Sequence, residues 1–165
     1  MRIKDIMSQP TVTCPSSAPL DAPARLMWEF DCGMIPIVGD DGRLAGLVTD
    51  RDICLAAYMH RKPLHLIPVT KVMVKHVITI HGNDSVESAE HLMRDNHIRR
   101  LPVIDDDGRP VGVLSIDDLA RLAARAGRGV VAHELVATLA AVSRPRTGTA
   151  TAGQRPLVAR SNTHA

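Results

Sequence analysis

An internal repeat constrains the fold of this chain more than any other feature. Shifting the sequence by 66 residues aligns positions 3–53 with 69–119 without a gap. The match keeps proline, glycine and aspartate in step, because Pro36 falls on Pro102 and Asp52 on Asp118. Each copy has roughly 55 to 60 residues, too few to bury a core of its own comfortably. The chain is therefore a tandem duplication, and we expect its two copies to pack together.

Each copy has the pattern of a β-α-β-β-α unit. In the second copy, the β-branched residues of 77–80 predict a strand, bounded by a turn that begins at His81. The segment Asp84-Ser85-Val86-Glu87 is typical of a capping box that opens a helix. An Asp-Gly turn then joins two continuously apolar strands, as expected for strands buried on both faces. These strands are expected at 101–105 and 110–115, followed by a second helix from Ser115.

The first copy repeats this order. Its hairpin strands are expected at 35–39 and 44–49, and its second helix begins at Thr49. Its first helix, from Pro19 to Phe30, contains Pro23 near the limit of what a helix tolerates. We therefore expect this helix to bend or to begin late.

A further helix and a tail follow the two copies. Apolar residues recur on one face of a predicted helix at 127–143, and we expect this face to cover the chain's own core or to pack on a partner. Those residues are Val131, Leu135, Leu139 and Val142. The segment 144–165 lacks periodicity, which predicts disorder. The predicted organisation is a mixed α+β fold with copies at 1–60 and 69–126 and a linker at 61–68.

The stretch GLVTDRD places two carboxylates, Asp50 and Asp52, directly behind a strand. Such a pair fits a metal site, an acid/base pair, a helix cap or a grip on a polar ligand at the strand end. The spacing Thr49-x-x-Asp52, echoed by Ser115-x-x-Asp118, is that of an N-cap hydroxyl with an acid at N3. The other acid of each first turn is expected only to complement the helix dipole.

Charge and aromatic content disfavour nucleic-acid binding. Residues 1–125 carry 15 Lys and Arg against 17 Asp and Glu, so this part of the chain has no general basic surface. The only aromatic residues are Trp28, Phe30 and Tyr58, too few for base stacking. We expect no nucleic-acid partner.

Cysteine, histidine and hydropathy patterns disfavour three further classes. The three cysteines lack C-x-x-C spacing and the eight histidines lack an HExxH pattern, which argues against a disulfide framework and a metal site. The N-terminus has no apolar signal-peptide region, and no apolar run approaches the ~20 residues of a membrane span. We expect a cytoplasmic protein without membrane contact.

Taken in order, twice and at one spacing, these motifs resemble the CBS domain, the cystathionine-β-synthase-type repeat, whose paired form is called a Bateman module. The resemblance covers about residues 2–125. It is carried by KDIM and TKVM, the two Leu-Met pairs of the helices, the Asp-Asp-Gly-Arg turns, and the closing GLVTDRD and GVLSIDD. It implies two repeats related by a pseudo-two-fold axis, with clefts that bind AMP, ADP or ATP, or in some members S-adenosylmethionine. No cofactor is required.

The resemblance also implies which residues bind the ligand. The Asp of each [TS]-x-x-D motif holds the ribose hydroxyls, the Thr or Ser contacts ribose or phosphate, and apolar residues contact the base. The implied residues are Val12, Ile35, Pro36, Thr49, Arg51 and Asp52 in one cleft, and Ile78, Arg100, Leu101, Pro102, Ser115 and Asp118 in the other. Arg100 matches an arginine that meets phosphates in nucleotide-binding members. The first copy lacks this cation, and Arg51 is its candidate substitute. We therefore expect the Asp118 cleft to be the better nucleotide site.

Three functions stay open at this point. The first is a stand-alone regulatory module, homodimeric as paired CBS modules commonly are, that senses an adenosine-type ligand and signals to an unidentified partner protein. The second is a structural or interaction protein with empty clefts. The third, an enzyme that uses the Asp clusters, is disfavoured because the sequence has no activated nucleophile and no Gly-rich phosphate loop.

Overall fold

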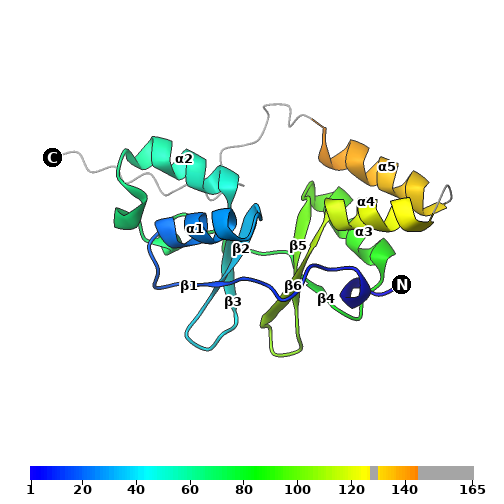
Figure 1. Ribbon diagram of the computed structural model, residues 1–165, viewed down its shortest axis with the longest axis horizontal. Helices are drawn as coiled ribbons and strands as arrows, with labels where there is room; N and C mark the ends of the chain where they lie inside the picture. Colours follow the sequence, from blue (N-terminus) through cyan, green and yellow to red (C-terminus); the bar gives the residue numbers. More distant parts are fainter. Residues whose placement is uncertain (127–129, 145–165) are drawn as a thin grey trace. The chain divides into compact units, whose positions relative to one another are not determined.

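The computed structural model describes residues 1–126 and 130–144 (Figure 1). The first repeat contains η1 (Ile3–Asp5), β1 (Cys14–Pro15), α1 (Asp21–Glu29), β2 (Met34–Val38), β3 (Leu44–Thr49) and α2 (Asp50–His60). After η2 (Leu64–Leu66), the second repeat contains η3 (Val69–Lys71), β4 (Ile80–His81), α3 (Val86–Asn96), β5 (Arg100–Ile104), β6 (Pro110–Ser115) and α4 (Ile116–Ala126). The helix α5 (Val130–Val142) follows.

The 66-residue repeat of the sequence is also a repeat of structure. The bounds of η1, β1, β2, β3 and α2 return 66 residues later as those of η3, β4, β5, β6 and α4. Each repeat forms a three-stranded sheet, ordered β1-β2-β3 in one and β4-β5-β6 in the other. The first pair of strands in each sheet is parallel, and β5 and β6 are antiparallel. The predicted mixed α+β fold is therefore confirmed.

The compact units of the fold do not follow the repeats along the chain. Of the described residues, the first unit contains 1–11, 41–44, 77–126 and 130–144, and the second unit contains 12–40 and 45–76. The segment that enters each repeat is thus packed in the unit of the other repeat. Ile3 is fully buried in the core of the first unit, and Val69, its equivalent, in the core of the second.

Backbone pairing fixes these entry segments. In the first unit, the amide of Ser8 donates to the carbonyl of Val113 at 2.9 Å and the amide of Val113 donates back at 3.1 Å. In the second unit, Leu47 and Val74 exchange the same two bonds at 3.0 and 2.9 Å. These positions are related by the 66-residue shift. Each entry segment therefore covers the free edge of β3 or β6, which would otherwise expose unpaired backbone groups.

The first strand of the second repeat is shorter than the sequence predicts. The predicted strand at 77–80 is only Ile80–His81, so His81 lies in the strand and not in the turn. The amide and carbonyl of Val113 bond to Ser8 and therefore do not face β5. Pro102 is the partner of Val113 in β5, so the backbone groups of Pro102 face the other neighbour, β4. Proline has no amide hydrogen to donate, and this ends the β4 ladder.

The helix starts follow local capping. The helix α1 begins late, at Asp21, which confirms one of the two expectations and leaves Pro23 within the first turn, where proline is tolerated. Ser85 caps α3 by accepting from the amide of Ser88 at 3.1 Å. Because Ser88 occupies the third position of the helix, the capping box predicted for Asp84 to Glu87 is wrong, and the helix begins one residue later with Ser85 as its cap.

Burial differs between the two hairpin strands. The central strands β2 and β5 are buried on both faces, as predicted. In β3 and β6 only alternate residues are buried, so the prediction is wrong for these strands. The reason is their position at the edge of the sheet, next to only a short entry segment.

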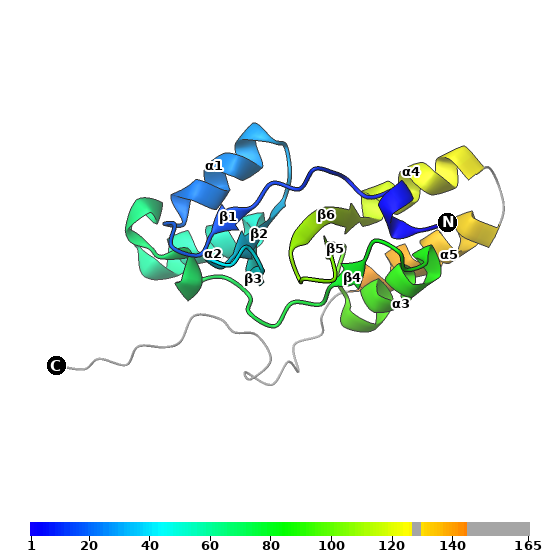
Figure 2. The ribbon, with the colours of Figure 1, turned by 90° about the horizontal axis from the view of Figure 1, so that it is seen from below.

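The helix α5 packs on α3 and α4 of the first unit (Figure 2). Leu135, Thr138 and Val142 are its buried residues. Leu139, predicted on the buried face, is 38% exposed, and the side chain of Val131 and the predicted tail from 145 on lie outside the described residues. Arg94 of α3 and Glu134 of α5 form an ion pair at 3.0 Å. This helix therefore covers the chain's own core, the first of its two expected roles.

A first prediction concerns Gly46, where the entry segment passes closest to the sheet. A Cβ added there would lie 2.7 Å from the carbonyl oxygen of Val74 and 2.8 Å from Sδ of Met73. At Gly112 the corresponding neighbour is only the flexible side chain of Met7. We expect Gly46→Ala to lower the free energy of unfolding in urea by about 1–3 kcal/mol, and Gly112→Ala to lower it less.

The matched control is Gly82→Ala, where the nearest atom, Cβ of Lys4, is 3.4 Å away. Equal stability of the Gly46 and Gly82 variants would show that the entry segment does not pack as described.

A second prediction concerns the buried acid Glu90 on α3. Burial raises the pKa of its carboxyl, and Arg94 opposes this shift. Because the pKa is higher in the folded chain, the native state loses stability as the pH rises through it. We expect Glu90→Gln to be more stable than the parent at pH 7, with the difference vanishing below the pKa of the unfolded chain.

Urea unfolding at several pH values measures this difference. Asp95→Asn, an exposed change on the same helix, is the control. A Glu90→Gln gain that does not depend on pH would contradict the assigned cause.

Candidate functional site

The second repeat forms a tightly bonded cluster around Asp118. The amide and hydroxyl of Ser115 donate to Oδ2 of Asp118 at 2.7 and 2.6 Å, and the amide of Asp118 donates to the Ser115 hydroxyl at 3.2 Å. Oδ1 accepts from the hydroxyl of Ser8 at 3.3 Å and from Arg121. Asp118 is only 3% exposed. Both of its oxygens are therefore held within the protein.

The first repeat has the same motif with one oxygen left open. The amide and hydroxyl of Thr49 donate to Oδ2 of Asp52 at 3.0 and 2.6 Å, which completes a capping box at the start of α2. Oδ1 of Asp52 accepts no hydrogen bond from the described residues, and Asp52 is only partly buried. The capping role expected from the spacing is thus present, and one carboxylate oxygen is still available to a ligand.

Two substitutions between the repeats explain this difference. The 66-residue shift places Val74 where the other repeat has Ser8, and Leu55 where it has Arg121. Neither apolar side chain can donate a hydrogen bond to Asp52. Ser8 and Arg121 were not predicted from the sequence, because both lie outside the [TS]-x-x-D motif. The non-conservative pair of Ser8 and Val74 inside the aligned range was the available signal.

The predicted residues of the second repeat divide between two faces of its sheet. Leu101 is fully buried in the core of its own unit, so the residues on either side of it in β5 point away from that core. These residues are Arg100 and Pro102. Arg100 lies directly opposite Ser115 in the β5–β6 register, so the structure brings Arg100, Pro102 and Ser115 to one face.

The first repeat follows the same division. Ile35 is fully buried in its core, while Pro36 and Met34 lie on the opposite face, which they share with Thr49. Met34, at 5% exposure, occupies the position of Arg100. This face therefore has no cation in the place where the second repeat has one.

The remaining predicted residues are Val12, Ile78 and Arg51. Val12 and Ile78 are partly buried and pack against the cores of their units, just before the first strands. Arg51 is exposed at the start of α2, and its side chain forms no hydrogen bond or ion pair with the described residues. Its amide donates to Asp50, which is exposed in the first turn of the helix, where a carboxylate complements the dipole.

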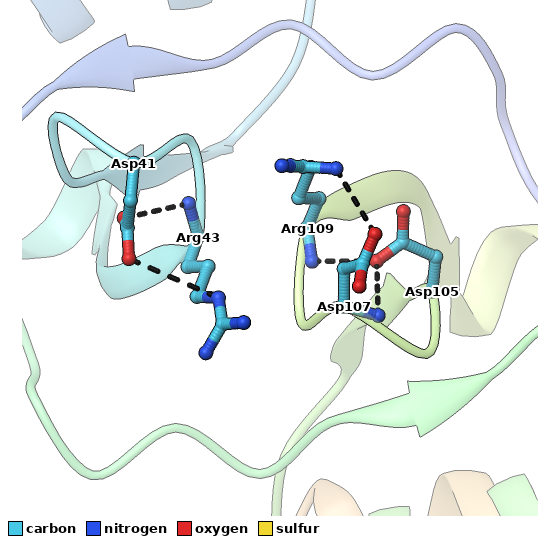
Figure 3. Close-up of polar contacts among 5 residues, drawn as sticks. All are labelled: Asp41, Arg43, Asp105, Asp107 and Arg109. Atoms are coloured by element: carbon cyan, nitrogen blue, oxygen red, sulfur yellow. Dashed lines mark hydrogen bonds and ion pairs between the residues drawn. The ribbon is translucent and has the colours of Figure 1, made fainter.

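The carboxylates of the two hairpin loops bond to groups within their own turns (Figure 3). Asp41 accepts from the amide of Arg43 at 3.0 Å and lies 3.8 Å from its guanidinium. Asp105 accepts from the amides of Asp107 and Arg109 at 3.0 and 2.8 Å, and Arg109 pairs with Asp107 at 3.1 Å. These carboxylates stabilise the loops. No group of three His, Cys, Asp or Glu in the described ranges could hold a metal ion.

The family follows from the two matched repeats. A family model described as the CBS domain matches residues 3–65 and again 69–125. The chain belongs to the CBS domain family. Its two repeats make it a tandem CBS module, as the resemblance implied.

Similarity to known CBS proteins extends over most of the chain. The CBS domain-containing protein YhcV of Bacillus subtilis is 35% identical over 118 residues, which are 72% of this chain and 82% of that protein. A solved CBS domain pair, that of protein MJ0100 in complex with 5′-methylthioadenosine and S-adenosyl-L-methionine, is 29% identical with a TM-score of 0.70. The similarity covers 77% of this chain and 98% of that one.

Some similar proteins are much longer. The chain is 31% identical over 120 residues to the L-aspartate semialdehyde sulfurtransferase of Methanocaldococcus jannaschii, which is 73% of this chain but only 23% of that protein. The chain thus spans about a quarter of the length of this curated relative. Among the helices that the structure describes, none is long and apolar enough to cross a membrane.

A third prediction tests the difference between the two motifs. Asp118→Ala removes the acceptor for Ser8, Ser115 and Arg121, so we expect the free energy of unfolding to fall by about 2–3 kcal/mol. Asp52→Ala removes only a capping-box acid, which contributes about 1 kcal/mol.

Urea denaturation of both variants gives the comparison, and Asp117→Ala, an exposed change in the same turn, is the control. Equal losses at Asp52 and Asp118 would contradict the inequivalence of the two clusters.

Proposed function

We propose that this CBS pair binds an adenosine-type ligand through its [TS]-x-x-D motifs and regulates a partner protein. The observation that carries the proposal is the state of Asp52, whose Oδ2 is fixed by Thr49 while Oδ1 accepts no bond from the described residues. A carboxylate held in this way offers a charge-assisted acceptor to a ribose hydroxyl. The MJ0100 pair, solved with two adenosyl compounds, supports the same class of ligand.

We expect Asp52 to bind a ribose hydroxyl with higher affinity than Asp118 does. A ribose hydroxyl at Asp118 would have to displace Arg121 and Ser8 from Oδ1, whereas Oδ1 of Asp52 accepts no hydrogen bond from the described residues. For the ribose alone, this order differs from the preference for the Asp118 cleft that the sequence suggested from Arg100, which concerns the phosphate of a nucleotide. The side-chain contacts of Asp118 are the reason for the change.

The two repeats also differ in which 5′ group they suit. Arg100 lies opposite Ser115, beside the start of α4, where a cation and a helix N-terminus together favour a phosphate. In the first repeat the buried Met34 takes the place of Arg100, and the cation in this region is the exposed Arg51. We therefore propose that the first repeat prefers an adenosyl ligand without phosphate, such as 5′-methylthioadenosine, and that AMP, ADP or ATP requires the second.

The ligand has a regulatory role in this proposal. The acidic residues that could suggest catalysis are engaged in helix caps or hairpin turns, and the described residues contain no metal cluster. Empty clefts are the competing function, and the occupied Asp118 favours them for the second repeat alone. A homodimer, a cytoplasmic location and a regulated partner protein, which the sequence does not identify, stay predictions from the sequence.

A fourth prediction tests the ligand by calorimetry. We expect 5′-methylthioadenosine or S-adenosylmethionine to bind the parent chain, and Asp52→Asn to weaken binding about tenfold or more because a charged hydrogen bond is lost. Asp50→Asn makes the same chemical change two residues earlier, in an exposed residue, and is expected to bind like the parent.

Thermal shift gives an independent readout. A ligand at about 100 times its Kd stabilises a protein by about 2.7 kcal/mol, or roughly 2–4 °C at this size. No shift with any adenosine compound at millimolar concentration would favour empty clefts. Equal binding by the Asp52→Asn variant would show that Asp52 is not the ribose acceptor.

A further inference from the structure

The helix α5 shields a carboxyl group of α3 from solvent. Glu90 is 4% exposed, and it accepts no hydrogen bond and forms no ion pair within the described residues. The 66-residue shift places Ala24 at the same position of α1, in the other unit, and Ala24 is partly exposed. The charge of Glu134 on α5 acts on Glu90, and α5 packs on α3, so α5 is the element that covers this group. A carboxylate buried without a partner is costly to ionise.

Arg94 has one carboxylate partner on α5 and a second carboxyl group within reach on its own helix. Its Nη1 donates to Oε2 of Glu134 at 3.0 Å, and its Nη2 lies 3.2 Å from Nδ1 of His91. Glu90 precedes Arg94 by four residues on α3, the spacing at which an acid and a cation pair along a helix. The structure therefore shows Arg94 bound to one of two acids that compete for it.

The titratable and charged groups around Glu90 come from two helices. Arg94, Glu87 and His91 belong to α3 and Glu134 to α5, and the groups described on α4 are not among them. Burial is the largest effect and raises the pKa of Glu90, while Arg94 opposes this shift and Glu134 adds to it. An ionised Glu90 is therefore unfavourable beneath α5, and it is favourable where it meets both water and Arg94.

Two further polar contacts hold the end of α5, and both lie at the surface. Nδ1 of His97 is 3.2 Å from the carbonyl oxygen of Ala141, and Arg99 donates to the hydroxyl of Ser143 at 3.3 Å. The helix itself has 13 residues, a length that is marginally stable in water without tertiary packing. Once released, α5 would therefore unfold and open its backbone amides to solvent.

We propose that α5 is a displaceable cover, released when Arg94 leaves Glu134 and pairs with the ionised Glu90. The proton of Glu90 passes to solvent in this step, and Glu134 keeps its charge in water. Release uncovers the surface of α3 and α4 on which α5 packs. All of these groups belong to the first unit, whereas Asp52 belongs to the second. The cover and the ligand proposal can therefore fail separately.

Amide hydrogen exchange of the full chain, followed by NMR over a series of pH values, tests this proposal. Protection factors remove the intrinsic pH dependence of exchange. Because the pKa of Glu90 is raised beneath α5, the closed form binds the proton more tightly, and α5 opens more often as the pH rises. We expect the protection of residues 135–142 to fall by up to about tenfold per pH unit between the pKa values of Glu90 in the open and closed forms, and to level off above the higher one. The amides of α4 keep their protection, because only α5 opens.

Two variants separate the causes. Glu90→Gln keeps the shape of the side chain without its charge, and we expect the protection of α5 to become independent of pH. Glu134→Gln removes the competing acid, so Arg94 can pair with Glu90 while α5 stays in place, and we expect the pH dependence to fall by at least half on a logarithmic scale. Glu87→Gln, an exposed change on the same helix, is the matched control and is expected to behave like the parent chain.

Four results would overturn the proposal. Constant protection of α5 in the parent chain would show that ionisation does not release it. An equal fall in Glu90→Gln would assign the cause to another group, such as His97. A fall shared by the amides of α3 and α4 would show a loss of global stability without a separate release of α5. An unchanged pH dependence in Glu134→Gln would show that Arg94 is not exchanged between the two acids.

Discussion

The exchange of entry segments is the interaction on which the rest of the structure depends. Each segment supplies a core residue, Ile3 or Val69, and a backbone pair at the edge of the sheet in the other repeat's unit. A single repeat would lack both the core residue and the edge cover, in addition to being small. The two repeats therefore complete one another, which gives a physical reason for finding them in tandem.

The same exchange brings the entry segment to the candidate site. Ser8 pairs with Val113 in β6 and also donates its hydroxyl to Asp118. A ligand that competes for Asp118 would therefore act on the segment that joins one repeat to the other's sheet. In the second unit Val74 makes the same backbone pair without any bond to Asp52. The fold is repeated, while the link between site and entry segment is present on one side only.

Much of the fold could be predicted from the sequence because its signals are local. Short-range patterns predict the Asp-Gly turns, the apolar hairpin strands and the hydroxyl caps at Thr49 and Ser115. Because the repeat is constant at 66 residues, each pattern occurs in both copies and supports the same prediction. The short β4 could not be predicted in this way. The strand is short because the backbone nitrogen of Pro102, which has no hydrogen to donate, faces β4. This orientation follows only from the pairing of Ser8 with Val113.

The candidate site was predictable in its residue types but not in its chemistry. The motif identifies Asp52 and Asp118 equally, whereas their availability depends on neighbours contributed by distant segments. Arg121 lies one turn further along α4 and Ser8 lies 110 residues earlier, and neither belongs to the motif. The two faces of each strand were also missed, since Leu101 and Pro102 are adjacent in sequence but only Leu101 joins the core.

A crystal structure of the chain with 5′-methylthioadenosine would test the central claim, the inequivalence of the two carboxylates, most directly. We predict that a ribose hydroxyl lies within hydrogen-bond distance of Oδ1 of Asp52, while Asp118 keeps its bonds to Ser8 and Arg121. Ribose bound to Asp118, with Arg121 displaced and the Asp52 site empty, would contradict the account.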